Sequence, residues 1–206
     1  MEIELKYSIP TQEIADEIWV NRTFFTMEEE GSREELTFDA RYFDTADCDL
    51  MDREMAYRVR KEGDHWVAAL KWKGHTEGAL HKRDEINVPV ENGEPNPGVF
   101  CESKIGNTLI ELVGEKQLQC VLETKFHRRR FRLDTGRGIF EVSIDRGEII
   151  TSVGSEPILE VEIELFSGET EELLELGTKL SETFGLESEE KSKYARGVEL
   201  IEKNRY

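Results

Sequence analysis

The sequence predicts a single α+β domain, residues 1–206, in which roughly eight mostly antiparallel strands close into a β-barrel with helices packed outside. Runs in which charged and apolar residues alternate recur along most of the chain, which is the pattern of strands with one apolar face. Turn signals that contain glycine join several of these runs as hairpins, and hairpins make antiparallel neighbours. Helical spacing is confined to the start, the middle and the end of the chain, which favours an α+β arrangement.

The first half of the chain is predicted to contain one helix and a series of strands. The first strand covers 2–9, and Thr11 is a helix N-cap that Ile14 and Ile18 follow at helical spacing. Gly63 and Asp64 form a turn pair, so the runs on either side are expected to be the two strands of a hairpin. The further strands of this half are expected over 34–44, 55–61, 65–73 and 81–90.

The second half is predicted to contain the remaining strands and most of the helix. The segment 169–184 is amphipathic, with Leu173 and Leu180 in its apolar stripe and Gly185 as its stop. Short helices are expected within 99–114, and a last helix is expected over 191–204. The remaining strands are expected over 118–133, 139–146 and 159–165, with the glycine-containing turn at 134–138 joining the first two as a hairpin.

The composition argues against several classes of function. A net charge of −18 is unfavourable for a surface that holds nucleic acid through its phosphates. No run of about 18 apolar residues could cross a membrane, and no leader-like segment precedes the first strand, so a cytoplasmic location is expected. The three cysteines form no CxxC pair, which is typical of reduced thiols, and the P-loop, GxGxxG and HExxH motifs are absent.

The sign of the charge is sorted by strand. The acidic faces belong to the first strand and to two late strands, and their residues are Glu2, Glu4, Glu141, Asp145, Glu160, Glu162 and Glu164. Lys6 shares the face of the first strand. The strands between them in the sequence carry basic faces, which contain Arg58, Arg60, Lys71, Lys73, Arg83, Lys125, Arg128, Arg129, Arg130 and Arg132. A solvated surface does not usually sort its charges in this way.

Two interpretations of these faces are open. In the first, they are the outer faces of a two-layer sheet, stabilised by ion pairs between strands. In the second, they line the interior of a barrel whose apolar faces pack against helices. Like charges gathered in an interior need counter-ions, and only a divalent cation beside a polyanion satisfies both walls. Carboxylates without a histidine or cysteine cluster select Mg²⁺ or Mn²⁺, and a polyphosphate suits the many basic donors.

The ordered set of these residues is similar to the CYTH superfamily, the triphosphate tunnel metalloenzymes. The Glu2-x-Glu4-x-Lys6 pattern resembles the ExExK signature of that superfamily, and supporting segments follow in the family's order over nearly the whole chain. These segments are Tyr42-Phe43-Asp44-Thr45, Arg58-x-Arg60, Lys71, Arg83-x-Glu85, Lys125 with the following arginines, Asp145, Glu160-x-Glu162 and Ser192-Lys193-x-x-Arg196-Gly197. The segments 123–128 and 192–197 resemble the bacterial inorganic triphosphatase branch.

The resemblance implies a closed antiparallel tunnel that binds a triphosphate together with Mg²⁺ or Mn²⁺. The metal ligands that it implies are Glu2, Glu4, Asp145, Glu160 and Glu162. The phosphate-binding residues that it implies are Lys6, Arg58, Arg60, Lys71, Arg83, Lys125, Arg128, Arg130 and Lys193. Glu4, Glu162 and Lys6 are expected to be catalytic. The sequence does not decide which of Arg128, Arg129 and Arg130 face the tunnel, because a β-bulge would shift the alternation.

The predicted function is divalent-metal-dependent hydrolysis of triphosphate, with inorganic triphosphate and nucleoside triphosphates as substrates. Three alternatives stay open: a class IV type adenylyl cyclase that forms cyclic AMP and pyrophosphate from ATP, a thiamine triphosphatase, and a non-catalytic module that binds polyphosphate or nucleotide. The complete set of carboxylates favours catalysis, because a pure anion binder gains nothing from them. The expected partner is a small molecule that contains a triphosphate, and a homodimer is compatible with the resemblance alone.

Overall fold

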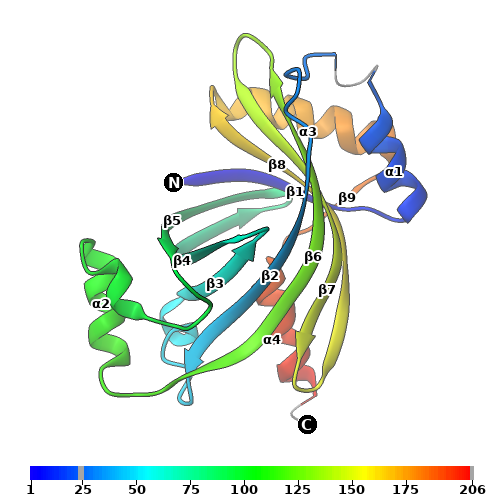
Figure 1. Cartoon of the computed structure of the whole chain (residues 1–206). Helices are drawn as coiled ribbons and strands as arrows, with labels where there is room; N and C mark the ends of the chain where they lie inside the picture. Colours follow the sequence, from blue (N-terminus) through cyan, green and yellow to red (C-terminus); the bar gives the residue numbers. More distant parts are fainter. Residues whose placement is uncertain (23–25, 205–206) are drawn as a thin grey trace.

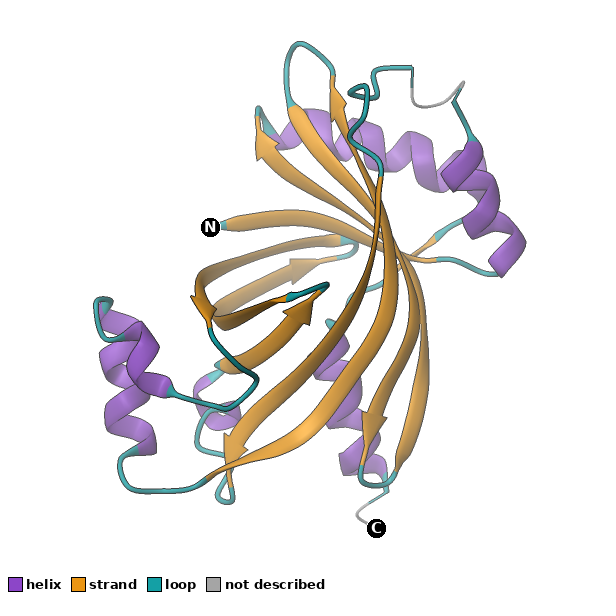
Figure 2. Cartoon of the chain, viewed as in Figure 1, coloured by secondary structure: helices purple, strands orange, loops and turns teal. Residues whose placement is uncertain are grey.

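The computed structural model describes residues 1–22 and 26–204, and its central feature is an antiparallel sheet that closes on itself (Figures 1 and 2). Within the described residues, eight long strands pair in the order β5-β4-β3-β2-β6-β7-β8-β1, and β1 also pairs with β5. The strands are β1 (Glu2–Ser8), β2 (Glu34–Thr45), β3 (Ala56–Glu62), β4 (His65–Glu77), β5 (Leu80–Val90), β6 (Leu118–Asp134), β7 (Ile139–Thr151) and β8 (Gly154–Ser167). The predicted closed barrel is therefore confirmed.

The strand that closes the barrel is β1, because it pairs with β8 on one side and with β5 on the other. Glu2 lies opposite Arg83 of β5, and Lys6 lies opposite Glu162 of β8. The alternation along β1 sends Leu5 to the opposite face, where it is buried in the outer core. A two-residue strand, β9 (Glu187–Ser188), also pairs with β1. The first strand thus brings charge to the interior while it anchors the apolar layer outside.

Helices α1 (Gln12–Val20) and α3 (Thr170–Phe184) cover the outer face of the barrel around β1 and β8 (Figure 1). The predicted N-cap of α1 is confirmed, since the side chain of Thr11 accepts a hydrogen bond from the Ile14 N–H at 3.4 Å. Leu173 of α3 is fully buried in the apolar cluster beneath the two helices. This layer holds the acidic strands β1 and β8 in place from outside.

A second outer layer covers β3, β4 and β5. It consists of helix α2 (Lys104–Val113) and the short 3₁₀ segments η1 (Met51–Arg53) and η2 (Pro97–Phe100). Tyr57 of β3 packs edge to face against Phe100, with the ring centroids 5.7 Å apart. The helices predicted within 99–114 are confirmed, and they support the strands that carry the basic faces.

Helix α4 (Lys193–Lys203) packs on inward-facing apolar side chains at one end of the barrel. Its Tyr194 shares an apolar cluster with Leu122 of β6 and Ile149 of β7. Gly197 permits this approach, because an added Cβ would lie 2.6 Å from Leu122 Cδ2 and 3.0 Å from Ile149 Cγ2. This end of the interior is therefore filled by apolar side chains, and the charged side chains occupy the rest.

The observed strands extend beyond the predicted ones at several ends. Strands β7 and β8 continue to a turn at 151–154 that the sequence pattern did not predict, so β8 begins well before the run at 159–165. Thr151 stabilises this turn by donating a hydrogen bond from its hydroxyl to the Gly154 carbonyl at 2.9 Å. In the part of the chain that the structure describes, no helix combines the length and the apolar character needed to span a membrane.

Candidate active site

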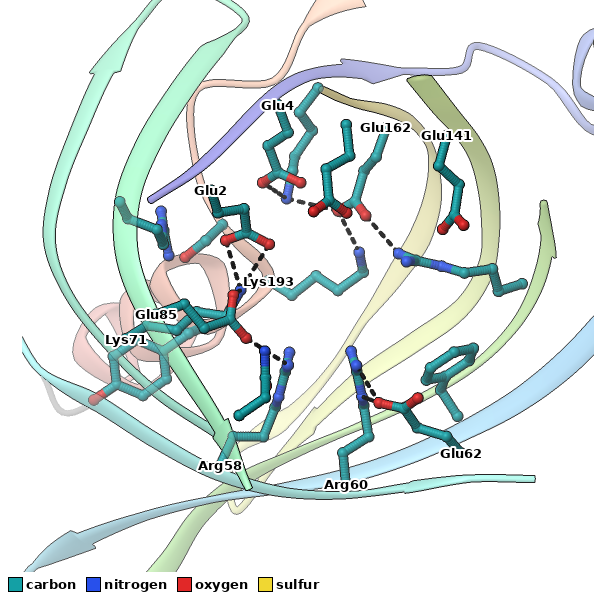
Figure 3. Close-up of a pocket in the computed structure, with 18 of the residues that line it drawn as sticks. Glu2, Glu4, Arg58, Arg60, Glu62, Lys71, Glu85, Glu141, Glu162 and Lys193 are labelled. Carbon is teal, nitrogen blue, oxygen red and sulfur yellow. Dashed lines mark hydrogen bonds and ion pairs between the residues drawn. The ribbon is translucent and has the colours of Figure 1, made fainter. Parts of the chain in front are cut away.

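The part of the barrel interior that α4 leaves open is a charged cavity of about 390 Å³ (Figure 3). Its acidic lining residues are Glu2, Glu4, Glu62, Glu85, Glu141, Glu162 and Glu164. Its basic lining residues are Lys6, Arg58, Arg60, Lys71, Arg83, Arg128, Arg130 and Lys193. Figure 3 shows Glu4, Glu141 and Glu162 on one wall, with Arg58 and Arg60 on the opposite wall. Most residues of the charged faces therefore point inward, and the interpretation as outer faces of a two-layer sheet is wrong.

Carboxylates from three neighbouring strands form a row on the acidic wall. In the sheet register, Glu164 of β8 lies opposite both Glu4 of β1 and Glu141 of β7. Glu4 contacts Lys6 at 3.6 Å, and Glu141 contacts Arg130 at 3.4 Å. Among the residues that the structure describes, Glu164 makes no ion pair of this kind. Like charges on adjacent strands repel, so a cation bound at this row would relieve an electrostatic cost.

The carboxyl group of Glu164 is hard to ionise in this environment. Burial raises its pKa, the nearby charges of Glu2, Glu4, Glu141 and Glu162 add to the increase, and the resulting pKa is about 8. Because the ionised form of this carboxylate is unfavourable, a bound divalent cation stabilises it more than it would stabilise a solvated carboxylate.

We expect the metal-free protein to lose stability as the pH rises from 4.5 to about 8, and we expect Glu164→Gln to reduce that loss. In this window the folded protein keeps a proton on Glu164 that the unfolded chain has released, so stability falls as the pH approaches the folded pKa. Thermal denaturation in EDTA across this pH range measures the effect in both proteins, and added Mg²⁺ should restore the stability of the wild type at the alkaline end. Identical pH slopes for the two proteins would contradict the expectation.

At the floor of the cavity, carboxylate oxygens of Asp145, Glu160 and Glu162 lie within 4.8 Å of one another, and all three residues are buried. The Nζ atom of Lys193 contacts all three, at 2.7 Å from Asp145 and 3.0 Å from Glu162. Further cations pair with this cluster: Lys6 at 2.8 Å from Glu162, Arg128 at 2.7 Å from Asp145 and Arg196 at 2.9 Å from Glu160. The cluster is thus neutralised by the protein's own cations, and it orients Lys6 and Lys193 at the floor of the cavity.

On the basic wall, Glu85 of β5 lies between two cations. Its Oε2 atom is 2.6 Å from Lys71 Nζ, and its Oε1 atom is 3.7 Å from Arg58. Burial opposes its ionisation, but Lys71 and Arg58 outweigh that effect and lower the pKa of Glu85 to about 2. The Nε atoms of Arg58 and Arg83 are buried without a hydrogen-bond partner among the described residues. Unsatisfied donors on arginines that line a cavity fit an anion such as a phosphate group.

Most of the predicted site residues lie together. Those that line the cavity are Glu2, Glu4, Lys6, Arg58, Arg60, Lys71, Arg83, Arg128, Arg130, Glu162 and Lys193. Asp145 and Glu160 lie beneath it in the buried cluster. The expectation for Lys125 is wrong, because this side chain is 49% exposed on the outside of the barrel and pairs with Glu123 at 3.1 Å.

The alternation along β6 explains both the error at Lys125 and the question left open for the arginines. Arg128 and Arg130 line the cavity, so the odd-numbered residues of this strand point outward. Arg129 accordingly contacts Asp16 of α1 at 2.8 Å. A regular strand cannot send both Lys125 and Arg128 inward.

Four glutamates that line the cavity are not among the predicted site residues, and these are Glu62, Glu85, Glu141 and Glu164. Glu141 and Glu164 belong to the predicted acidic faces, and Glu85 belongs to a family segment, but no site role was expected for them. Glu164 carries a recognisable signal, because it shares its strand face with the predicted residue Glu162. The cross-strand register distinguishes it from Glu160, since Glu164 lies opposite Glu4, whereas Glu160 lies opposite Ser8. The sequence alone did not show which end of β8 reaches the open half of the interior.

The donor set of the acidic wall fits a divalent metal ion. Glu2, Glu4 and Glu164 supply carboxylate oxygens, and oxygen donors without histidine or cysteine favour Mg²⁺ or Mn²⁺. The opposite wall supplies guanidinium and ammonium groups, which bind phosphate oxygens. The cavity can therefore hold a metal ion and a polyanion side by side.

Comparison with known proteins agrees with this geometry. The model of the CYTH domain family matches residues 1–198. The chain is 30% identical over 174 residues to the inorganic triphosphatase of Haemophilus influenzae. That alignment covers 84% of this chain and 47% of the relative, so the chain spans about half the length of this curated protein.

Solved structures show the same fold at low sequence identity. A Hippeastrum protein, HpAC1, for which a dominant triphosphatase activity is described, superposes with a TM-score of 0.68 at 19% identity, covering 97% of this chain and 96% of that one. The PH1819 protein of Pyrococcus horikoshii superposes with a TM-score of 0.59 at 20% identity, covering 99% of this chain and 100% of that one. Because the family model extends over nearly the entire sequence, the chain belongs to the CYTH domain family.

Proposed function

We propose that this protein hydrolyses triphosphate in a divalent-metal-dependent reaction, with inorganic triphosphate and nucleoside triphosphates as substrates. The observation that carries the proposal is the cavity itself, in which a row of carboxylates faces a wall of arginine and lysine side chains. The Haemophilus relative is an inorganic triphosphatase, which supports the same reaction for the part of that protein that this chain spans. A metal ion and a phosphate chain together neutralise both walls.

The phosphate chain is bound by cations that reach it from different strands. Arg58 and Arg60 project from β3, Lys71 from β4 and Arg83 from β5, whereas Lys193 reaches the floor of the cavity from the start of α4. Phosphoryl transfer needs little covalent help from an enzyme, so a rigid set of charged donors can supply much of the rate enhancement. The outer helices and the buried ion pairs keep this set fixed before the substrate arrives.

The carboxylates placed to hold Mg²⁺ or Mn²⁺ are Glu2, Glu4 and Glu164. When bound, such a metal supplies charge neutralisation and lowers the pKa of a coordinated water. The register favours Glu164 over Glu160 as a ligand, because Glu164 lies opposite Glu4 and lines the cavity, whereas Glu160 lies opposite Ser8 and is buried below the cavity. Glu162 belongs both to the buried cluster, where it contacts Lys6, and to the lining of the cavity.

An adenylyl cyclase is the second candidate. The same cavity could bind ATP, and the outcome depends on which phosphorus atom lies beside the nucleophile. Attack of the ribose hydroxyl on the α-phosphorus releases pyrophosphate, whereas attack of water on a terminal phosphorus releases phosphate.

A cytoplasmic location and a homodimer stay predictions from the sequence.

A single assay distinguishes these functions. The purified protein is incubated with inorganic triphosphate, ATP or thiamine triphosphate in Mg²⁺, Mn²⁺ or EDTA, and phosphate, pyrophosphate and cyclic AMP are quantified. The proposal expects metal-dependent release of phosphate, with inorganic triphosphate and ATP as substrates. Cyclic AMP and pyrophosphate from ATP would assign a cyclase instead. Binding of triphosphate without any product would assign a non-catalytic module.

A further inference from the structure

Arg60 is held by a carboxylate that lies within the cavity itself. Its Nε atom donates a hydrogen bond to Glu62 Oε1 at 2.7 Å, and its Nη2 atom contacts the same oxygen. Glu62 follows Arg60 on the same face of β3, and Figure 3 shows the two side chains turned toward each other on the basic wall. Within the described residues, Glu62 is the ion-pair partner of Arg60, and no second carboxylate contacts this arginine.

The surroundings of Arg60 make it a strong attractor of anions. Its guanidinium lies 4.7 Å above the ring of Phe38, and its side chain is only 17% exposed. Burial, together with the neighbouring charges of Arg58 and Arg128, lowers the pKa of Arg60 to about 10 despite the opposing effect of Glu62. The cation is therefore only partly compensated, and a phosphate group competes for the same donors that Glu62 uses.

We propose that Glu62 is a positioning residue that acts as an internal competitor for Arg60, weakening the binding of phosphate ligands and so promoting release of a phosphate product. This inference rests on the proposed triphosphatase function. Carboxylate and phosphate oxygens bind guanidinium donors in the same geometry, so Glu62 and the ligand compete for Nε and Nη2 of Arg60.

The effect on ligand affinity follows from this competition. A ligand binds with full strength only when Arg60 is free, so its apparent affinity falls with the fraction of molecules in which Glu62 holds the arginine. The side chain of Glu62 is 25% exposed, which allows it to turn toward water when a polyanion enters. This competition weakens the binding of substrate and of pyrophosphate by a similar factor.

The test is the affinity of Glu62→Gln for pyrophosphate, measured by calorimetry in Mg²⁺. Glutamine keeps the shape of the side chain but forms no ion pair, and we expect the dissociation constant of pyrophosphate to fall by about three- to tenfold. In steady-state assays, the KM for inorganic triphosphate should fall by a similar factor while kcat does not rise. Glu77→Gln, which changes an exposed glutamate of β4 outside the cavity, is the matched control and should change neither constant.

A second comparison asks whether Glu62 acts through Arg60. In an Arg60→Ala background, Glu62→Gln should change the dissociation constant of pyrophosphate by less than about twofold, because the competition no longer exists. A full effect in that background, or an unchanged or weaker affinity of the single variant, would overturn the proposal. If Glu62→Gln does not fold, Glu62→Asp should show a smaller shift in the same direction, and no shift would overturn the proposal as well. Failure of the proposed function is a separate result, seen as absence of phosphate release by the wild type.

Discussion

Glu4→Gln is expected to reduce metal-dependent phosphate release by at least about a hundredfold while the protein stays folded. Glu4 lies in the carboxylate row with Glu164, its side chain is 12% exposed, and its ion-pair partner is Lys6 at 3.6 Å. The amide is nearly isosteric but a poor metal ligand, so the variant loses negative charge at the place where the cation is needed. Phosphate release from inorganic triphosphate at saturating Mg²⁺ measures the loss.

The controls for Glu4→Gln separate metal binding from folding. The thermal midpoint should stay close to that of the wild type, because the amide removes repulsion within the row as well as a weak ion pair. Glu115→Gln, at an exposed position after α2, is a matched variant that should keep full activity. A folded Glu4→Gln protein with undiminished turnover would refute the assignment of the acidic wall as the metal site.

The alternation of charge along single strands was enough to predict which charged residues share a face, whereas the family resemblance was needed to expect those faces inside a barrel. Glu2, Glu4 and Lys6 share a face because side chains alternate along a strand, and the same rule applies to Arg58 with Arg60. The rule is local and depends only on backbone geometry. It therefore grouped the charged residues correctly wherever the strand was regular.

The error at Lys125 arose where the family pattern and this alternation disagree. Lys125 and Arg128 lie three positions apart, so a regular strand sends them to opposite faces, and β6 is regular across this stretch. The family pattern places a lysine near this position, but the alternation excludes it from the cavity. Strand geometry was the more reliable guide at this residue.

What the sequence could not supply was the depth of each residue in the barrel. Glu160 and Glu164 share a face of β8, yet the first is buried under the cavity and the second lines it. This difference is set by the register between β8 and β1 and by helix α4, which fills one end of the interior. Both depend on contacts between segments far apart in the chain, which no local pattern encodes.

Lys193 illustrates how such a long-range contact joins stability to function, and Lys193→Met is expected to impair both. The ammonium group bridges Asp145, Glu160 and Glu162 with only 9% of its side chain exposed. Removing it leaves three buried carboxylates with too few partners, which typically costs about 3–5 kcal/mol. The variant should melt at a lower temperature, and its KM for inorganic triphosphate should rise because a cation is missing from the floor of the cavity.

The pH dependence of that loss distinguishes unpaired charge from simple loss of packing. In the wild type, burial acts against the ionised form of Glu162, but Lys193 and the other nearby cations hold its pKa well below the usual value, so its contribution is present at neutral pH and is lost on acidification. Without Lys193 the carboxylates resist ionisation, so the variant should be destabilised more at pH 8 than at pH 5. Lys203→Met, at the exposed end of α4, is the control and should leave the thermal midpoint unchanged. If Lys193→Met lost the same stability at pH 5 and at pH 8, Lys193 would stabilise the end of the barrel by packing alone. The buried carboxylates would then not depend on Lys193 for their ionisation.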